Sequence, residues 1–492
     1  MMYQSTRDAS HKKYSAAEVI KMGLAPDGGL FIPESIPALT KDEITALCKD
    51  SYPVRAAKIL GKFLTDYTYE ELLSDCEAAY AESSFPGGAA PLVHIHDNIY
   101  SLELWHGPTA AFKDMALQIM PRLLSRAIVK TGETRDALIL VATSGDTGKA
   151  ALEGYKDIDR IKIMVFYPVD GVSRVQKLQM ATQTGGNVNV CAIRGNFDDA
   201  QTGVKKIFGD AEMAAKLADK GFVLSSANSI NWGRLAPQIV YYVSAYCDLL
   251  NKGALRMGET MDVCVPTGNF GNIFAGYIAK LMGLPVRHFV CASNKNNILT
   301  DFLRTGTYDR NRDFHLTMSP SMDILISSNL ERLLCFTAGE ERTAAYMESL
   351  KKDGAYTVDA DVIAAINENF SGYFADEAAT AATIKSYFES YDYLADTHTA
   401  VALSAAEQYV ANLSDVRPMV VDSTASPYKF AADVYESLGK TQPADPLAAL
   451  DELASATNTE IPYPLRGLGQ REVRFTKVID AEEMPVAVLE WC

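Results

Sequence analysis

Residues 136–155 read DALILVATSGDTGKAALEGY, and this stretch decides the expected fold. Residues 136–142 form a continuous apolar run, which is typical of a strand buried on both faces of a parallel sheet. A loop of small and hydroxyl-bearing residues follows, and residues 149–155 have a helical pattern. The stretch therefore predicts one strand–loop–helix unit, and ligands of such sheets bind where the loop meets the helix.

The same unit recurs along the chain. Further strands are predicted at residues 161–167, 187–193, 261–265, 286–291 and 419–421. Helical patterns alternate with them at residues 173–182, 198–208 and 273–282. Short buried strands that alternate with helices predict an α/β fold built on parallel sheet.

Length and punctuation predict several domains, because a chain of 492 residues is too long for one ordinary core. Residues 1–90 carry helical patterns and end in the Pro- and Gly-rich SFPGGAAP (84–91), so we expect an N-terminal domain there. Two α/β regions are expected at 91–260 and 261–492. The second includes a helical insertion at about 330–395, with helices predicted at residues 340–346, 358–370 and 377–390.

The composition excludes several classes of protein. Hydrophobic residues make up 48% of the chain and charged residues 22%, which is too apolar for disorder. The formal net charge of -16 argues against nucleic acid as a partner, because phosphate backbones favour a basic surface. An anionic substrate would have to be attracted locally, by a few cations and helix N-termini.

The sequence gives no sign of secretion or of membrane insertion. The N-terminal residues lack the apolar segment of a signal peptide, and no apolar run approaches the length that spans a bilayer. The eight cysteines include no C-x-x-C pair, so neither a metal site nor a redox dithiol is expected. We therefore expect a cytoplasmic protein with free thiols that binds neither membranes nor nucleic acid.

Three loops have a composition suited to binding an anion. They are ATSGDTG (142–148), PTGNFGN (266–272) and DSTASP (422–427), and each follows a predicted strand. Each loop alone is equally consistent with an ordinary turn. Nucleotide motifs do not fit, because PTGNFGN lacks a third glycine and Gly148-Lys149 is followed by Ala150 rather than Ser or Thr.

A lysine stands out in the segment LELWHGPTAAFKDMALQ (102–118), where Lys113 follows an aromatic-rich stretch. A lysine in apolar surroundings loses its charge more easily, and an uncharged amine can form an imine with an aldehyde cofactor. Composition alone favours the other interpretation, in which Lys113 is a solvated helix lysine.

Four motifs in order decide between these interpretations. HGPTAAFKD, SGDTG, PTGNFGN and STASPYKF together resemble the threonine synthase family of the fungal and bacterial type. The wider kinship is with fold-type II pyridoxal-phosphate enzymes, the tryptophan synthase β-like group. YQSTR and GLAPDGGLFIPESIP near the N-terminus, and SPSMDILISSNLERLL (319–334), are similar to family segments too, so the resemblance covers nearly the whole chain.

The resemblance implies a fold, a cofactor and a reaction. The fold would be two open parallel-sheet domains with an N-terminal domain and a helical insertion. The enzyme would be a lyase of threonine biosynthesis that uses pyridoxal 5'-phosphate. It would convert O-phospho-L-homoserine and water to L-threonine and phosphate, as a monomer or a homodimer.

The family's functional residues can be carried over to this chain. Lys113 would bind the cofactor as a Schiff base, Asp146 would lie near its 3'-oxygen, and Thr424 would face its pyridine nitrogen. The cofactor phosphate would lie in a cup formed by Gly268, Asn269, Phe270, Gly271 and Asn272. The substrate carboxylate would be bound by the hydroxyls of Thr143, Ser144 and Thr147.

A further segment, SANSINWGRL (226–235), is similar to the family stretch that binds the substrate phosphate. Asn228, Ser229 and Arg234 match its pattern, and an arginine fork suits a phosphate dianion. The chain departs from the family at Ser426, where a histidine is more common, so substrate contacts could differ there. His106 and His398 are left open as either structural or proton-transferring residues.

Two other functions remain open. A sister lyase, such as a serine/threonine dehydratase, would use the same cofactor but would need no second phosphate site. A non-catalytic phosphate- or nucleotide-binding module would use the same glycine loops without a cofactor aldehyde.

Overall fold

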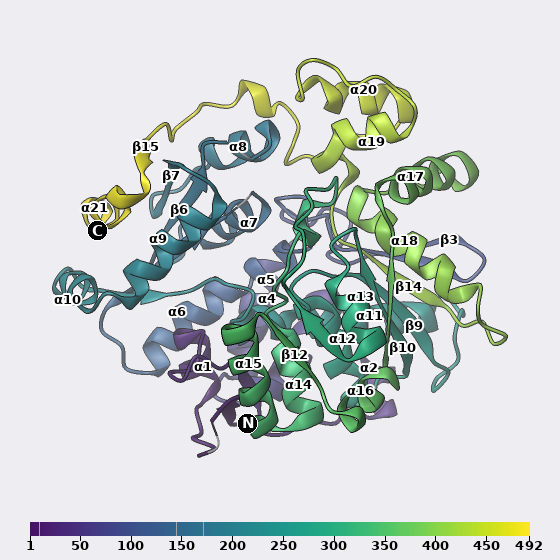
Figure 1. The fold of residues 1–492 in the computed structure, drawn as a ribbon, viewed down its shortest axis with the longest axis horizontal. Helices are drawn as coiled ribbons and strands as arrows, with labels where there is room; N and C mark the ends of the chain where they lie inside the picture. Colours follow the sequence, from purple (N-terminus) through teal and green to yellow (C-terminus); the bar gives the residue numbers. More distant parts are fainter. Residues whose placement is uncertain (9, 144, 171) are drawn as a thin grey trace.

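Two parallel sheets organise the molecule (Figure 1). The computed structural model describes residues 1–8, 10–143, 145–170 and 172–492. The larger sheet consists, in spatial order, of β13 (Phe370–Phe374), β10 (Val286–Ser293), β9 (Met261–Pro266), β14 (Met419–Ser423), β4 (Ile99–Glu103) and β3 (Leu92–His96). All neighbours pair in parallel except β3 and β4.

The smaller sheet is parallel throughout. It consists, in spatial order, of β15 (Val478–Asp480), β7 (Val188–Arg194), β6 (Ile161–Pro168), β5 (Asp136–Ala142) and β8 (Phe222–Ser225). All six strands predicted from apolar runs are confirmed, each within two residues of its predicted bounds. Their buried positions explain the continuous apolar runs, since helices cover parallel sheets.

The helices predicted beside these strands are also confirmed. Those of the smaller sheet are α7 (Asp146–Tyr155), α8 (Arg174–Ala181) and α9 (Phe197–Gly209), and a further helix that was not predicted, α10 (Ala211–Asp219), follows α9. Helix α9 begins at a capping box, in which the side chains of Asn196 and Asp199 each accept from the other's backbone N–H. The segment between β4 and β5 contains α5 (Asp114–Leu117) and α6 (Met120–Lys130).

The N-terminal segment forms a small ribbon and four helices. The strands β1 (Tyr3–Ser5) and β2 (Phe31–Pro33) pair antiparallel. The helices are α1 (Ala16–Met22), α2 (Lys41–Leu47), α3 (Tyr52–Phe63) and α4 (Tyr69–Ala79). Three of them start at a Ser/Thr-x-x-Glu capping box, whose N-cap residues are Ser15, Thr40 and Thr68.

The remaining helices belong to the second half of the chain. They are α12 (Gly271–Leu281), α13 (Ile298–Thr305), α14 (Leu330–Ala338), α15 (Glu340–Asp353), α16 (Ala360–Asn367), α17 (Glu377–Tyr391), α18 (Thr397–Val410), α19 (Ala431–Ser437), α20 (Ala448–Thr457) and α21 (Met484–Trp491). Short 3-10 turns lie at η1 (Pro320–Met322), η2 (Pro427–Phe430), η3 (Leu468–Gln470) and η4 (Ala481–Glu483), and β11 (Thr307–Asp309) pairs antiparallel with β12 (Ala355–Thr357).

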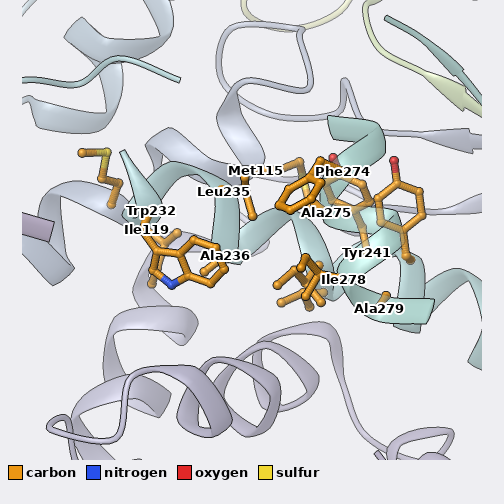
Figure 2. Packing of buried hydrophobic residues seen from close by; sticks show 14 of the residues in the cluster. Met115, Ile119, Trp232, Leu235, Ala236, Tyr241, Phe274, Ala275, Ile278 and Ala279 are labelled. Atoms are coloured by element: carbon orange, nitrogen blue, oxygen red, sulfur yellow. The ribbon is translucent and has the colours of Figure 1, made fainter. Parts of the chain in front are cut away.

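Helix α11 (Trp232–Asn251) lies at the centre of the hydrophobic core, and nearly all of its side chains are buried. Its first residue, Trp232, lies 5.5 Å from the ring of Tyr3 and 5.8 Å from that of Phe63. Figure 2 shows Tyr241 of α11 beside Phe274 of α12. The N-terminal segment therefore shares its core with the rest of the chain. Within the described ranges no helix is long and apolar enough to cross a lipid bilayer.

The sheets divide the chain differently from the expected regions 91–260 and 261–492. Strands β3 and β4 come from the first region but belong to the larger sheet, where β4 pairs with β14. Strand β15 comes from the second region but pairs with β7 in the smaller sheet. In Figure 1 the yellow C-terminal segment runs from α20 across to β15 and α21, beside β7. Parallel neighbours are joined by long connections, so sheet membership need not follow chain order.

The expected helical insertion is only partly helical. Helix α16 ends at Asn367, and the residues from Phe370 form β13, which extends the larger sheet beside β10. The helix predicted at 358–370 is therefore wrong at its C-terminal end. Residues 370–374 (FSGYF) alternate between buried and half-buried positions until the last residue, which is exposed. This alternation is typical of a strand, but in so short a segment it is hard to distinguish from a helical pattern.

Candidate active site

The loops that follow strands of both sheets meet at one place. The backbone N–H of Phe112, in the segment after β4, donates to the carbonyl of Thr424, after β14, at 2.8 Å. Ala111 and Ala425 form an isolated antiparallel bridge beside this bond. Asp146, after β5 of the smaller sheet, lies 3.9 Å from Lys113. Three separate stretches of sequence thus meet at Lys113, as expected for the carboxyl ends of parallel strands.

Lys113 occupies the N-cap position of α5 and is largely buried, with 11% of its side chain exposed. Its Nζ donates to Oγ of Ser321 at 3.4 Å and lies 5.1 Å from the centre of the Phe112 ring. Burial lowers the pKa of Lys113; Asp146 opposes this effect, and the cations Lys429 and Arg234 add to it. Lys113 is therefore not a solvated helix lysine, and a neutral amine is accessible at lower pH than usual.

Asp146 is the first residue of α7 and lies between two lysines. Its Oδ2 faces Lys113, while its Oδ1 lies 2.7 Å from Nζ of Lys429 and accepts from Nε2 of Gln176 at 2.9 Å. Burial would raise the pKa of Asp146, but Lys429 and Lys113 outweigh burial, and the pKa lies below its ordinary value. Asp146 therefore carries its negative charge at neutral pH.

The loop 266–272 presents backbone donors at the start of α12. Phe270, its N-cap residue, adopts a left-handed conformation with φ 61°, and the helix begins at Gly271. The N–H groups of residues 269–272 find no acceptor among the described residues. A Cβ added to Gly268 would lie 2.8 Å from the carbonyl oxygen of Ser321. The loop therefore combines close backbone packing with free donors, which suits an anion.

A buried polar network lies behind this loop. The hydroxyl of Tyr242 lies 2.6 Å from Oδ1 of Asn272 and 2.7 Å from Oδ2 of Asp422, within hydrogen-bond distance of both. Burial raises the pKa of Asp422 to about 7, and the hydrogen bond with Tyr242 opposes this effect. The Nδ2 atom of Asn272 is buried and has no partner among the described side chains and backbone. Thr424, two residues after Asp422, is 6% exposed.

The stretch from the end of β5 to the start of α7 carries the three hydroxyl residues predicted to bind the substrate carboxylate, and the structure describes two of them. Thr143 is buried, and its Oγ1 accepts from the N–H groups of Gly145 at 3.0 Å and Gly148 at 2.9 Å. Thr147 is half-buried in the first turn of α7. Ser144 lies outside the described residues. The hydroxyl of Thr143 thus holds the turn that leads into α7.

Arg234 lies in the first turn of α11 and is 4% exposed. Its Nη1 donates to the carbonyl of Ala227 at 2.9 Å, whereas its buried Nε has no acceptor among the described residues. Burial lowers the pKa of Arg234 to about 10. Nearby, Ser229 donates to Oδ1 of Asn228 at 3.2 Å. No described carboxylate forms an ion pair with Arg234, so its charge is available to an anionic ligand.

Two residues that the sequence did not single out lie at this site. Lys429, within the motif STASPYKF, is fully buried and bound to Asp146. Ser321, within SPSMD, contacts Lys113. Both lie in motifs that resemble family segments, and that resemblance is the signal in the sequence that could have identified them. Their partners lie hundreds of residues away in the chain, so spacing could not identify them.

The histidines and Ser426 are structural in their contacts. Nε2 of His398 accepts from the backbone N–H of Ser321 at 3.1 Å, and its Nδ1 bonds to Oδ2 of Asp396 at 3.1 Å. His106 bonds to Glu103 at 2.8 Å and stacks on Trp105. Ser426 is buried, and its Oγ accepts from the N–H of Tyr428, which caps the η2 turn that carries Lys429.

Three family models match the chain. They describe the N terminus of threonine synthase at residues 2–80, pyridoxal-phosphate dependent enzymes at residues 85–421, and the C-terminal part of threonine synthase at residues 399–487. The model of pyridoxal-phosphate dependent enzymes covers the loops after β4, β5 and β9 and ends at residue 421, before Lys429.

Individual proteins match over most of the chain. Threonine synthase-like 1 of Homo sapiens is 40% identical over 434 residues, which are 86% of this chain and 58% of that protein. The chain thus spans little more than half the length of that relative. Threonine synthase of Pseudomonas aeruginosa is 38% identical over 460 residues, with 92% of this chain and 93% of that protein covered. The crystal structure of threonine synthase from Brucella melitensis with bound pyridoxal phosphate matches with a TM-score of 0.89 and 37% identity, over 100% of this chain and 99% of that one.

Proposed function

Because the chain belongs to the threonine synthase family of pyridoxal-phosphate-dependent enzymes, we propose that it converts O-phospho-L-homoserine and water to L-threonine and phosphate. The observation that carries this proposal is the pairing of two features at one site. Lys113 provides a buried amine with a lowered pKa, and Arg234 provides a buried guanidinium whose Nε has no acceptor among the described residues.

The residues present fit pyridoxal phosphate. The free N–H groups of residues 269–272 suit its phosphate, the amine of Lys113 suits its aldehyde, and the hydroxyl of Thr424 suits a ring nitrogen that stays largely unprotonated. Asp146 lies within 3.9 Å of Lys113 and would thus lie beside the oxygen next to the aldehyde. When bound, this cofactor supplies an electron sink for carbanion chemistry at an amino acid.

In this proposal Lys113 moves protons at the reacting carbon atoms. Its lowered pKa makes the neutral amine accessible at lower pH than for an ordinary lysine, so Nζ can accept a proton and return it later. Asp146 stays ionised beside it and orients the protonated form of Nζ. Ser321 accepts a hydrogen bond from Nζ and further restricts its position.

Arg234 would bind the substrate phosphate and stabilise the charge that develops as phosphate leaves. Its Nε and one Nη are available for this because, within the described part of the chain, Nη1 is the guanidinium nitrogen that has a hydrogen-bond partner. Asn228 and Ser229 lie in the loop that leads into α11 and offer further polar side chains. A phosphate site built around a buried arginine favours this reaction over a dehydratase, which needs no such group.

Reductive trapping tests the proposal. Borohydride treatment of the loaded protein followed by peptide mapping should label Lys113 and not Lys149, a second buried lysine that pairs with Glu153. Lys113→Ala should lack the visible absorbance and release no phosphate from phosphohomoserine. Deamination of serine or threonine by the wild type, without phosphate release, would identify a dehydratase instead. A colourless protein after reconstitution would favour a binding module.

A further inference from the structure

Lys429 is a fully buried cation with three polar contacts among the described residues. Its Nζ lies 2.7 Å from Oδ1 of Asp146 and donates to the carbonyl of Thr109 at 3.1 Å and to Oε1 of Gln179 at 3.3 Å. None of its side chain is exposed, so it cannot touch a substrate in solution. Gln176 bonds to the same Asp146 oxygen, and completes a closed polar cluster.

The cluster joins the two sheets. Lys429 lies in η2, which follows β14 of the larger sheet, and Thr109 lies in the segment after β4 of that sheet. Asp146 begins α7, while Gln179 lies in α8, and both helices belong to the smaller sheet. A buried cation with no carboxylate would be strongly unfavourable, so Lys429 requires Asp146 for its own stability.

Asp146 divides its two oxygens between the two lysines. Oδ1 faces Lys429 at 2.7 Å and Oδ2 faces Lys113 at 3.9 Å. Coulomb energy falls with distance, so Asp146 attracts Lys429 more strongly than it attracts Lys113. Asp146 therefore orients Lys113 while much of its negative charge is already compensated.

We propose that Lys429 is a positioning residue that compensates the charge of Asp146, so that Asp146 orients Lys113 without holding a proton on its Nζ. The inference rests on the proposed function, because it concerns the amine that binds the cofactor. It assigns a role to a residue of STASPYKF that neither the cofactor nor the substrate contacts explain.

The charges around Lys113 agree with this role. Asp146 and Asp114 favour a proton on Lys113, whereas Lys429 and Arg234 disfavour it, and burial disfavours it most. Of these, Lys429 is the cation that contacts Asp146 directly. Removal of Lys429 leaves Asp146 uncompensated except by Lys113, so the proton on Nζ is held more strongly.

The test is a pH titration of the visible absorbance of the loaded protein. This absorbance reports protonation of the Schiff-base nitrogen at Lys113 and needs no substrate. Lys429→Met should raise the pH of the transition by about one unit, and Asp146→Asn should lower it by a similar amount. Lys429→Arg keeps the cation and should titrate within a few tenths of a unit of the wild type.

The double variant Lys429→Met with Asp146→Asn keeps the inference testable if Lys429→Met alone does not fold. It buries no uncompensated charge and should titrate above Asp146→Asn. If Lys429 only holds the structure together, a different result is expected. Loss of Lys429 would then release Asp146 and lower the pH of the transition, as Asp146→Asn does, or leave it unchanged. Either result overturns the inference. If the wild type forms no visible band at all, the proposed function fails instead.

Discussion

Nε2 of His398 accepts a hydrogen bond of 3.1 Å from the backbone N–H of Ser321. Because Nε2 is the acceptor, Nδ1 carries the proton and donates to Asp396, which caps α18. Ser321 in turn contacts Lys113. The imidazole therefore fixes the η1 turn against the amine rather than exchanging protons with it.

Replacement of His398 by alanine should loosen this turn. The N–H of Ser321 and the carboxylate of Asp396 each lose a partner, so the free energy of unfolding should fall by about 1–3 kcal/mol in urea titrations. His106→Ala is the control, because His106 is part-exposed and, among the described residues, contacts Glu103 and Trp105. This replacement should lower the free energy of unfolding by about 1 kcal/mol or less. Equal losses in both variants would contradict the assignment.

Arg234→Ala should raise KM for phosphohomoserine by about 10- to 100-fold, since charged hydrogen bonds of about 1.5–3 kcal/mol are removed. Steady-state phosphate release measures this effect, and the visible absorbance should show that cofactor binding is kept. Arg234→Lys keeps the positive charge but loses the forked guanidinium, so its KM should lie between those of the wild type and Arg234→Ala. Loss of cofactor in place of the KM effect would mean that the two phosphate sites are interchanged.

Gly268→Ala should weaken cofactor binding by about tenfold. The added Cβ would lie 2.8 Å from a backbone oxygen of Ser321, so the loop or the η1 turn has to move. Titration of the apoprotein with pyridoxal phosphate measures the change. Gly209→Ala is the matched control, because a Cβ there meets nothing within 4 Å. Unchanged affinity in Gly268→Ala would show that this loop does not seat the cofactor.

Asp422 should make the protein less stable as pH rises. Burial raises its folded pKa to about 7 from an unfolded value of about 4, so the folded state binds more protons between these values. Stability from this group is therefore present below about pH 4 and is lost as pH rises to about 7. Asp422→Asn removes the dependence, and its free energy of unfolding relative to wild type should increase by up to about 3 kcal/mol between pH 5 and pH 8. A constant difference across this range would refute the protonated carboxyl.

Much of the fold could be predicted because buried parallel strands are short and apolar. The run at 136–142 coincides with β5, and the loops after β5, β9 and β14 are the ones that carry or border the site. Helix α11 is absent from the predicted elements. It is buried on all sides and contains Pro237, so it shows neither a polar face nor an uninterrupted helical pattern.

The site was predictable only where chemistry is local. Lys113 and the glycine loop could be named as candidates from motifs, and strand order predicts that loops after parallel strands lie at one edge of a sheet. Lys429, Ser321 and the Asp146 ion pair could not, because a buried charge is explained by a partner that only the folded chain brings near. Strands β3 and β4 could likewise not be assigned to the larger sheet from their place in the chain, because β14, the partner of β4, lies far away in the sequence.

The pairing of Val478 with Ala192 has a consequence for synthesis on the ribosome. The strands β5 to β8 emerge early, but their last neighbour is translated near the end of the chain. Until β15 leaves the exit tunnel, β7 presents an open row of backbone donors and acceptors on which another nascent chain can add. Chains released before residue 478 keep that row open, so truncated products of this gene should aggregate rather than accumulate as folded fragments.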